Sequence, residues 1–156
     1  MYSVLKLNLW NIGGLFRVVD ILHKCGKDMA SKYDLHHWDN SHLKNWLIVL
    51  LCVLKNDVYL VVDRKTSVAT FQVRKIGNSL LFQKLATAPV YAGSGIGSFC
   101  LREIERIGRA YGCTDVICEV YDQSKHAISF YEHKGYCVYG AVDTLKYSEL
   151  KMKKEL

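Results

Sequence analysis

The sequence predicts an α+β protein whose sheet is mostly antiparallel but has a parallel pair of strands at its centre. Three observations support this prediction. Strand-like segments fill residues 58–88, a glycine-rich stretch at residues 93–97 leads into an amphipathic helix, and another strand-like segment follows at residues 115–121. A strand, a helix and a second strand within about 40 residues are typical of a right-handed parallel crossover.

The first third of the chain is expected to supply one strand and two helices. Residues 1–9 are largely apolar and fit a strand, and apolar residues at helical spacing predict a helix near residues 11–25. Residues 33–40 are polar and aromatic, as in a loop, and Asn40 or Ser41 can cap the second helix. The expected apolar face of that helix consists of Leu43, Trp46, Leu47, Leu50, Leu51 and Leu54.

The middle of the chain predicts three antiparallel strands. Residues 58–63, 68–76 and 80–88 are strand-like and are separated by polar turns, and Pro89 ends the third strand. The helix after the glycines is expected to bury a stripe spaced by three and four residues, formed by Ile96, Cys100, Ile104, Ile107 and Tyr111. Its opposite side is expected to carry Arg102, Glu103, Glu105, Arg106 and Arg109.

The last third is expected to hold a strand, a helix and a hairpin. Gly112 is a suitable helix terminator, and residues 115–121 follow it as a strand. A helix is expected over about residues 124–134, and residues 136–139 and 145–152 fit a closing hairpin.

Composition narrows the class of protein. The 156 residues suit a single domain spanning residues 1–156, and their six cysteines form no CxxC pair and have no histidine at metal-ligand spacing. Neither a signal peptide nor an apolar run long enough for a bilayer is visible, so we expect a reduced cytoplasmic protein without membrane or metal. The net charge of +6 would suit nucleic acid, but no helix has a dense basic face, so nucleic acid is not an expected partner.

The glycine-rich turn is the first candidate site. Backbone N–H groups converge in such a turn, and the helix behind it carries partial positive charge, so the turn can bind phosphate. The alternative is a tight connection that needs glycine only for positive φ. The turn is not a P-loop, because no Lys-Ser/Thr follows, and its glycine spacing differs from that of the dinucleotide fingerprint.

Two motifs together resemble the GNAT N-acetyltransferase superfamily. Residues 89–98, Pro-Val-Tyr-Ala-Gly-Ser-Gly-Ile-Gly-Ser, resemble its acyl-CoA signature, Gln/Arg-x-x-Gly-x-Gly/Ala. Residues 124–136 resemble its Asn-x-x-Ala-x-x-x-Tyr-x-x-x-Gly-Phe/Tyr block, in the family's order and separation. The sequence departs from the family at Ala92, usually Gln or Arg, and at Ser124, usually Asn.

The resemblance implies a fold and a cofactor site. The fold is the acyl-CoA N-acyltransferase fold, with αβα layers, six to seven strands, about four helices and a splayed fourth and fifth strand. Acetyl-CoA is the implied acyl donor, with its pantetheine arm between the splayed strands and its pyrophosphate on the amides of residues 93–97. The implied binding residues are Leu85, Ala86, Thr87, Ala92, Gly93, Ser94, Gly95, Ile96, Gly97, Ser98, Ser124, Ala127, Phe130 and Tyr131.

The resemblance also implies an acid and a base. Tyr131 matches the family's frequent general-acid tyrosine, which protonates the departing thiolate. Glu119 lies twelve residues earlier, as the base does in the ribosomal-protein alanine acetyltransferases of this superfamily. A water-mediated base is the alternative for Glu119, and each residue has a structural alternative: a glutamate bonded to a neighbouring strand and a packed aromatic.

The acceptor remains open at this stage. A primary amine of a small molecule is preferred, with a peptide or protein N-terminus or lysine as the alternative. The resemblance implies that the loop of residues 33–40 borders the acceptor pocket, where Asp34 or Asp39 can attract a cationic amine or simply cap the loop. Residues 139–144 are then the expected opposite rim of that pocket. A non-catalytic acyl-CoA-binding module is the alternative of another class, and a homodimer through the last hairpin's edge is compatible with the sequence.

Overall fold

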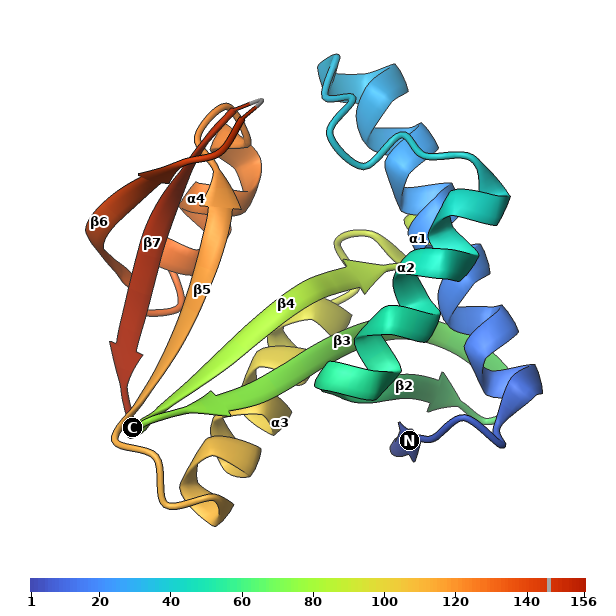
Figure 1. Ribbon diagram of the computed structural model, residues 1–156, viewed down its shortest axis with the longest axis horizontal. Coiled ribbons are helices and arrows are strands. Elements are labelled where there is room, and N and C mark those ends of the chain that lie inside the picture. Colours follow the sequence, from blue (N-terminus) through green and yellow to red (C-terminus); the bar gives the residue numbers. More distant parts are fainter. Residues whose placement is uncertain (146) are drawn as a thin grey trace. The chain divides into compact units, whose positions relative to one another are not determined.

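The protein, seen here in a computed structural model that describes residues 1–145 and 147–156, contains both helices and strands, with two consecutive helices followed by three consecutive strands (Figure 1). Its elements are β1 (Tyr2–Leu7), α1 (Ile12–Tyr33), α2 (His42–Lys55), β2 (Asp57–Asp63), β3 (Thr66–Ile76), β4 (Ser79–Thr87), a 3₁₀ turn (Pro89–Tyr91), α3 (Ile96–Ala110), β5 (Asp115–Tyr121), α4 (Lys125–Glu132), β6 (Cys137–Asp143) and β7 (Ser148–Glu155).

One seven-stranded sheet has the order β1-β2-β3-β4-β5-β7-β6. The β1–β2, β2–β3, β5–β7 and β7–β6 pairs are antiparallel, whereas β4 and β5 are parallel. The parallel ladder joins Ser79–Leu81 to Asp115–Ile117, at the beginning of both strands. The predicted α+β class, with its central parallel pair and four helices, is therefore confirmed for the described part of the chain.

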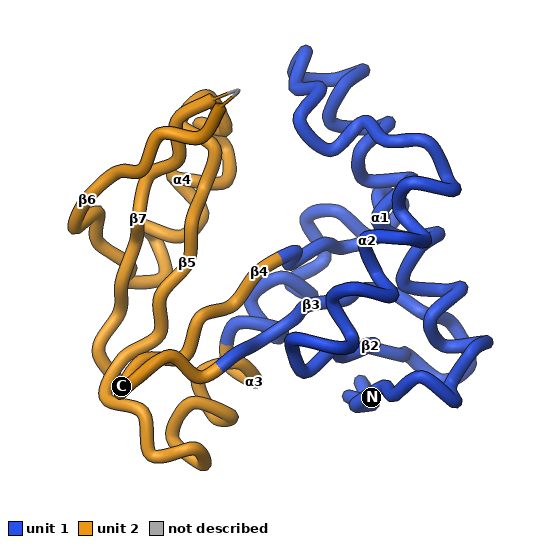
Figure 2. Tube along the Cα trace, viewed as in Figure 1, with its two compact units in different colours: residues 1–74, 84–101 blue, residues 75–83, 102–156 orange. Residues whose placement is uncertain are grey.

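The chain divides into two compact units (Figure 2). Unit 1 consists of Met1–Arg74 and Lys84–Leu101, and unit 2 consists of Lys75–Gln83 and Arg102–Leu156. Both β4 and α3 contribute residues to each unit, so the boundary runs through secondary structure rather than through a linker.

The core of unit 1 lies between β2 and the two N-terminal helices. Helices α1 and α2 lie side by side and both contact β2 (Figure 1). Strand β2 is buried over five consecutive residues, Val58–Val62, as expected for a strand with both faces covered. Val58, Leu60 and Val62 of this strand belong to the core together with Leu7, Leu15, Val18, Val19, Ile21, Leu22, Cys25, Val49, Ala86 and Ala88.

The predicted buried face of α2 is wrong, although the helix and its Ser41 cap are confirmed. Ser41 accepts a hydrogen bond from the Lys44 N–H at 3.2 Å. Val49 is fully buried, and Trp46 packs partly buried against the core. Because α2 has apolar residues on all of its faces, the periodicity of the sequence could not identify the face that is buried. The exposed leucines are Leu43, Leu47, Leu50, Leu51 and Leu54.

Helix α1 is about two turns longer than its spacing predicts. It passes through Gly26 and ends at Asp34, whose φ of 56° is left-handed and whose N–H bonds to the Met29 carbonyl. Only glycine fits at position 26, because a Cβ there would meet the Trp38 carbonyl oxygen at 2.2 Å. The loop after α1 therefore requires the glycine, which in the sequence alone resembles a terminator.

In unit 2, α3 packs through Gly108 against β4 and β5. A Cβ on Gly108 would lie 3.4 Å from a Val116 methyl group and 3.6 Å from a Leu80 methyl group. The predicted α3 stripe is confirmed at Ile96, Cys100, Ile104 and Ile107, which are all buried. Glu105, expected on the solvent side, is instead buried, and it forms an ion pair with Lys154 at 2.8 Å.

We predict that Lys154→Met lowers the free energy of unfolding by about 1–3 kcal/mol, because it leaves the buried Glu105 carboxylate without its cation. The Tyr136 hydroxyl still donates to Glu105 at 3.5 Å but cannot replace a charge. Urea unfolding measures the loss. The matched control is Lys24→Met, because Lys24 pairs with Asp20 on the surface and should lose only about 0.3–0.5 kcal/mol. Equal losses in the two variants would contradict the prediction.

The C-terminal hairpin lies later in the chain than predicted. Its strands are Cys137–Asp143 and Ser148–Glu155 instead of residues 136–139 and 145–152, and Lys146 lies outside the described residues. The register shifts between Val138 and Gly140, which makes Tyr139 the extra residue of a β-bulge. The helix predicted over residues 124–134 is the shorter Lys125–Glu132, followed by Gly135 at a φ of 86°.

Candidate active site

The glycine-rich turn lies in unit 1, between the 3₁₀ turn and α3. Gly93 and Gly95 have φ values of 77° and 84°, and a Cβ on either would meet no atom within 4 Å. Residues 92–95 are exposed, whereas Ile96 is buried and anchors the start of α3. Glycine is thus required by the backbone conformation and not by crowding, and the turn leaves its outer surface open.

Hydrogen bonds within the turn reduce the set of available donors. The Ala92 N–H donates to the Pro89 carbonyl at 3.1 Å, and the Ser94 N–H donates to the Tyr91 carbonyl at 3.2 Å. The Ser94 hydroxyl donates to the same Tyr91 oxygen at 2.5 Å. The first N–H groups of a helix have no intrahelical acceptor, so Ile96, Gly97 and Ser98 supply the donors that can face an anion.

Strand β4 contains a backbone bend close to the predicted acyl-binding residues Leu85, Ala86 and Thr87. Lys84 has a φ of 49°, a left-handed conformation inside a strand. The alternation of burial fails here, because Leu80–Phe82 are all buried while residues 83–85 are half-buried. A residue of this kind interrupts a ladder and redirects backbone groups. Sequence patterns could not reveal it, because lysine has no preference for positive φ.

Tyr131 lies on α4 in unit 2, in a cluster of aromatic rings. Its ring centroid is 5.6 Å from that of Phe82, 5.9 Å from that of Tyr136 and 5.4 Å from that of Phe130. Tyr131 is half-buried, whereas Tyr136 is buried and its pKa is raised by burial and then by Glu105. The Tyr136 hydroxyl is bonded to Glu105 inside unit 2, whereas Tyr131 is the phenol that matches the second motif and is the candidate proton donor.

Glu119 lies on the opposite face of β5 from the buried residues. Val116, Cys118 and Val120 are buried and Glu119 is exposed, as the alternation of a strand requires. Glu119 is paired in register with Lys151 of β7, and its charge contributes, after burial, to the raised pKa of Tyr139. The carboxylate therefore stands on an accessible, polar face together with a lysine and a phenol.

The second motif spans α4 and the turn that follows it. Ser124 is buried, its N–H donates to the Tyr121 carbonyl at 2.9 Å, and its own carbonyl accepts from Ala127 and Ile128. Ala127 and Phe130 are half-buried on the same helix, and the Lys134 ammonium lies 5.9 Å from the Phe130 ring centroid. The Ser124 hydroxyl caps nothing, so the residue that stands in place of the family's asparagine contributes mainly backbone contacts.

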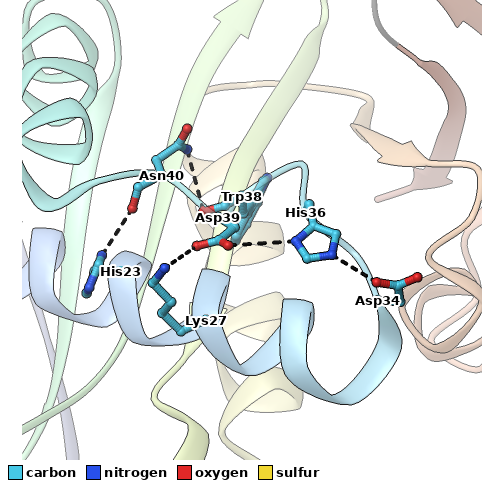
Figure 3. A network of polar contacts seen from close by, with 7 residues as sticks. All are labelled: His23, Lys27, Asp34, His36, Trp38, Asp39 and Asn40. Carbon is cyan, nitrogen blue, oxygen red and sulfur yellow. Dashed lines mark hydrogen bonds and ion pairs between the residues drawn. The ribbon is translucent and has the colours of Figure 1, made fainter.

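The loop between α1 and α2 brings the two candidate acceptor carboxylates into one polar network (Figure 3). His36 contacts Asp34 at 2.9 Å and Asp39 at 3.7 Å, and Asp39 forms an ion pair with Lys27 at 2.8 Å. The pKa of His36 is raised, mainly by its hydrogen bond to Asp34. The pKa of Asp39 is lowered, mainly by Lys27. Asp34 is exposed at the edge of this network, whereas Asp39 is half-buried.

A comparison with protein families gives one match. The model of the acetyltransferase (GNAT) family matches residues 26–136, which include the glycine-rich turn, Glu119 and Tyr131. No curated protein matches the sequence. None of the helices in the described part of the chain is long and apolar enough to cross a membrane.

Solved structures show the same fold. The PaiA N-acetyltransferase from Thermoplasma acidophilum, in complex with coenzyme A, is 19% identical with a TM-score of 0.80, and the alignment covers 100% of this chain and 99% of that one. The ribosomal-protein-S18-alanine N-acetyltransferase from Escherichia coli is 14% identical, with a TM-score of 0.74 over 99% and 94% of the chains. An aminoglycoside 6′-N-acetyltransferase complexed with coenzyme A is 13% identical, with a TM-score of 0.74 over 98% and 96%.

Proposed function

The chain belongs to the acetyltransferase (GNAT) family of acyltransferases, and from this membership we propose that it transfers the acetyl group of acetyl-CoA to a primary amine of a small molecule. One observation carries the proposal: the glycine-rich turn, left-handed at Gly93 and Gly95, opens onto the N-terminus of the 15-residue helix α3. We further propose that residues 1–156 work as one catalytic domain in the cytoplasm.

The residues of the turn fit the pyrophosphate of an acyl-CoA. A diphosphate needs several N–H donors and a positive field, and the start of α3 supplies both. The open surface at Gly93 and Gly95 allows close approach to the backbone. Ala92 offers only a methyl side chain, so the backbone donors of Ile96, Gly97 and Ser98 would hold the group beside the open glycines, while Leu85–Thr87 would hold the pantetheine arm.

The proposed chemistry divides into two proton transfers. Acetyl-CoA supplies an activated thioester carbonyl, whose carbon takes the new bond to nitrogen as its bond to sulfur breaks. Glu119, directly or through water, takes the proton that makes a primary ammonium unreactive, because such a group has a pKa of about 10 if it is lysine-like. Tyr131 gives its phenolic proton to the departing sulfur, and a backbone N–H of β4 polarises the carbonyl.

The acceptor is proposed to be a small cationic amine. The exposed Asp34 carboxylate, next to His36, supports this choice because it offers negative charge outside the protein's own ion pairs with lysine. A peptide N-terminus or a lysine is the second candidate, and the twelve-residue spacing of Glu119 and Tyr131 favours the N-terminus. The third candidate is an acyl-CoA-binding module without catalysis. It is favoured by Ala92 and Ser124, the two positions where the chain departs from the family motifs.

Mass spectrometry tests the function directly. Native spectra of the purified protein should show retained coenzyme A, and incubation with acetyl-CoA should yield acetylated products from a panel of polyamines, aminoglycosides and peptides with free N-termini. Products from peptides alone would select the second candidate. Retained coenzyme A without any product would favour the binding module, and neither retention nor product would refute the proposal.

We predict that Gly95→Ala weakens acetyl-CoA binding roughly 5- to 30-fold, because a left-handed φ costs a non-glycine residue about 1–2 kcal/mol. The added methyl group itself has room, so the effect should arise from the backbone. Isothermal titration calorimetry measures the affinity. The control is Gly13→Ala, since Gly13 also has open space but lies in the first turn of α1 at an ordinary φ. Equal affinities of Gly95→Ala and Gly13→Ala for acetyl-CoA would contradict a role for the turn in binding.

A further inference from the structure

The bend at Lys84 is held by something outside β4. A left-handed φ is unfavourable for lysine, and such residues persist only where surrounding contacts determine the conformation. Lys84 at a φ of 49° immediately precedes Leu85–Thr87, the segment proposed to hold the acyl donor. Whatever fixes Lys84 therefore fixes the direction in which that backbone leaves the bend.

One contact of Lys84 is with an aromatic ring from the loop between α1 and α2. The Lys84 ammonium lies over the Trp38 indole, 5.4 Å from the ring centroid. Both residues belong to unit 1. A cation at this distance from an indole face is attracted by the ring quadrupole, most strongly when the pair is shielded from water. Trp38 is half-buried and packs against the unit 1 core, which provides such shielding.

The backbone of Trp38 is held in place by contacts of its carbonyl group and of the next two residues, Asp39 and Asn40 (Figure 3). Its carbonyl oxygen occupies the space that a Cβ of Gly26 would fill, and it accepts the Asn40 N–H at 2.8 Å. The Asn40 carbonyl in turn accepts from His23 Nδ1 at 3.2 Å. Asp39 is bound by Lys27 at 2.8 Å. Residues 23–27 of α1 therefore hold the loop that carries Trp38 through contacts with residues 38–40.

The same turn of α1 also holds the end of β4. The Cys25 thiol donates to the Thr87 carbonyl at 3.0 Å. Ala86 and Ala88 are buried in the core that contains Leu22 and Cys25. Cys25 thus contacts the end of the segment 84–87 directly, and Trp38 contacts its bend. Gly26 leaves the space on α1 that the Trp38 carbonyl occupies.

We propose that Trp38 and Lys84 are positioning residues for acyl transfer. Their contact holds the bend that directs the backbone of Leu85–Thr87 toward the acyl donor, and it joins the loop carrying Asp34 and Asp39 to the donor-binding strand. Neither side chain needs to touch the reacting atoms. This inference rests on the proposed acetyl-CoA-dependent function, which it extends by two residues outside both family motifs.

Four variants test whether Lys84 and Trp38 act by fixing the backbone bend or in another way. Lys84→Met removes the charge but keeps a long side chain, whereas Lys84→Arg keeps a cation over the ring. Lys84→Gly removes the contact but adopts a positive φ without cost. Trp38→Leu removes the ring and leaves an apolar side chain. The measurements are kcat and KM for acetyl-CoA, together with the backbone amide chemical shifts of residues 85–87 in the substrate-free protein.

The expected result is a loss of kcat/KM of roughly 3- to 30-fold in Lys84→Met and in Trp38→Leu, as for the removal of one cation–π contact. The double variant should lose no more than either single variant, because both remove the same contact. Lys84→Arg should stay close to wild type, and Lys84→Gly should retain more activity than Lys84→Met. The amides of residues 85–87 should shift in Lys84→Met and Trp38→Leu but not in Lys84→Arg.

The inference would be overturned by wild-type kcat/KM in Lys84→Met, by additive losses in the double variant, or by unchanged amides of residues 85–87. A lower activity for Lys84→Gly than for Lys84→Met would also overturn it, since a long side chain at this position would then matter more than the left-handed bend. The amide shifts need no turnover. If wild type acetylates nothing, the proposed function fails while the shifts still decide whether Trp38 holds the bend.

Discussion

Tyr131→Phe should lower kcat by roughly 10²-fold or more, because the variant cannot protonate the departing thiolate. The ring contacts with Phe82, Phe130 and Tyr136 should survive, since they involve ring carbons and not the hydroxyl. KM for acetyl-CoA should therefore change little, and the loss should appear in kcat. Steady-state kinetics with a fixed amine acceptor measure the two constants separately.

The matched control for this variant is Tyr2→Phe. Tyr2 lies on the edge strand β1 and contacts Phe99 through its ring, at a centroid distance of 5.0 Å, so it also loses only a hydroxyl. Its kcat should equal that of wild type. Full activity in Tyr131→Phe would remove this residue from the mechanism, and Tyr136 could not replace it, because burial raises the pKa of Tyr136 and its hydroxyl is bonded to Glu105.

Glu119→Gln should lower kcat/KM for the amine at neutral pH by roughly 10²- to 10⁴-fold, the usual contribution of a general base. The amide keeps the shape of the side chain but cannot take a proton. At neutral pH almost all of a lysine-like amine is protonated, since its pKa is about 10. The deficit should therefore shrink as the pH approaches the pKa of the amine, where the nucleophile forms without help.

The pH profile separates this role from the structural alternative, in which Glu119 pairs with Lys151 across β5 and β7. A structural glutamate would give a deficit that stays constant with pH. The control is Glu103→Gln, because Glu103 forms an ion pair with Arg106 on the surface of α3, at 2.9 Å. Glu103→Gln should retain the wild-type kcat/KM at every pH measured. A pH-independent deficit in Glu119→Gln would assign the base role to another group or to water.

The elements that local pattern determines were predictable from the sequence. The α3 stripe, the three antiparallel strands and the turn at Gly77, with its φ of 58°, all depend on near neighbours in the chain. The resemblance to the GNAT family is likewise confirmed, because the family match includes both motifs. The roles of Tyr131 and Glu119 remain predictions, although both lie on the elements where the sequence placed them.

The errors concern features that distant residues determine. Position 26 of α1 needs a glycine because the Trp38 carbonyl fills the space of a Cβ, and the buried Glu105 is neutralised by Lys154, 49 residues later. The inner face of α2 is chosen by its packing on α1 and β2 and not by its own periodicity. The bend at Lys84 belongs to the same class, since an indole from another element accompanies it. Sequence periodicity carries no information about such contacts.

The burial of Cys25 and Cys118 has a chemical consequence for a protein that is proposed to handle a thioester. Thiolates, and not thiols, attack acyl groups. Burial raises the pKa of Cys25 to about 12 and also raises that of Cys118, so neither ionises appreciably at neutral pH. The interior of each unit is thereby protected from S-acylation by the enzyme's own donor. Among the described cysteines, Cys137 is the exposed one, and unintended S-acetylation should begin there.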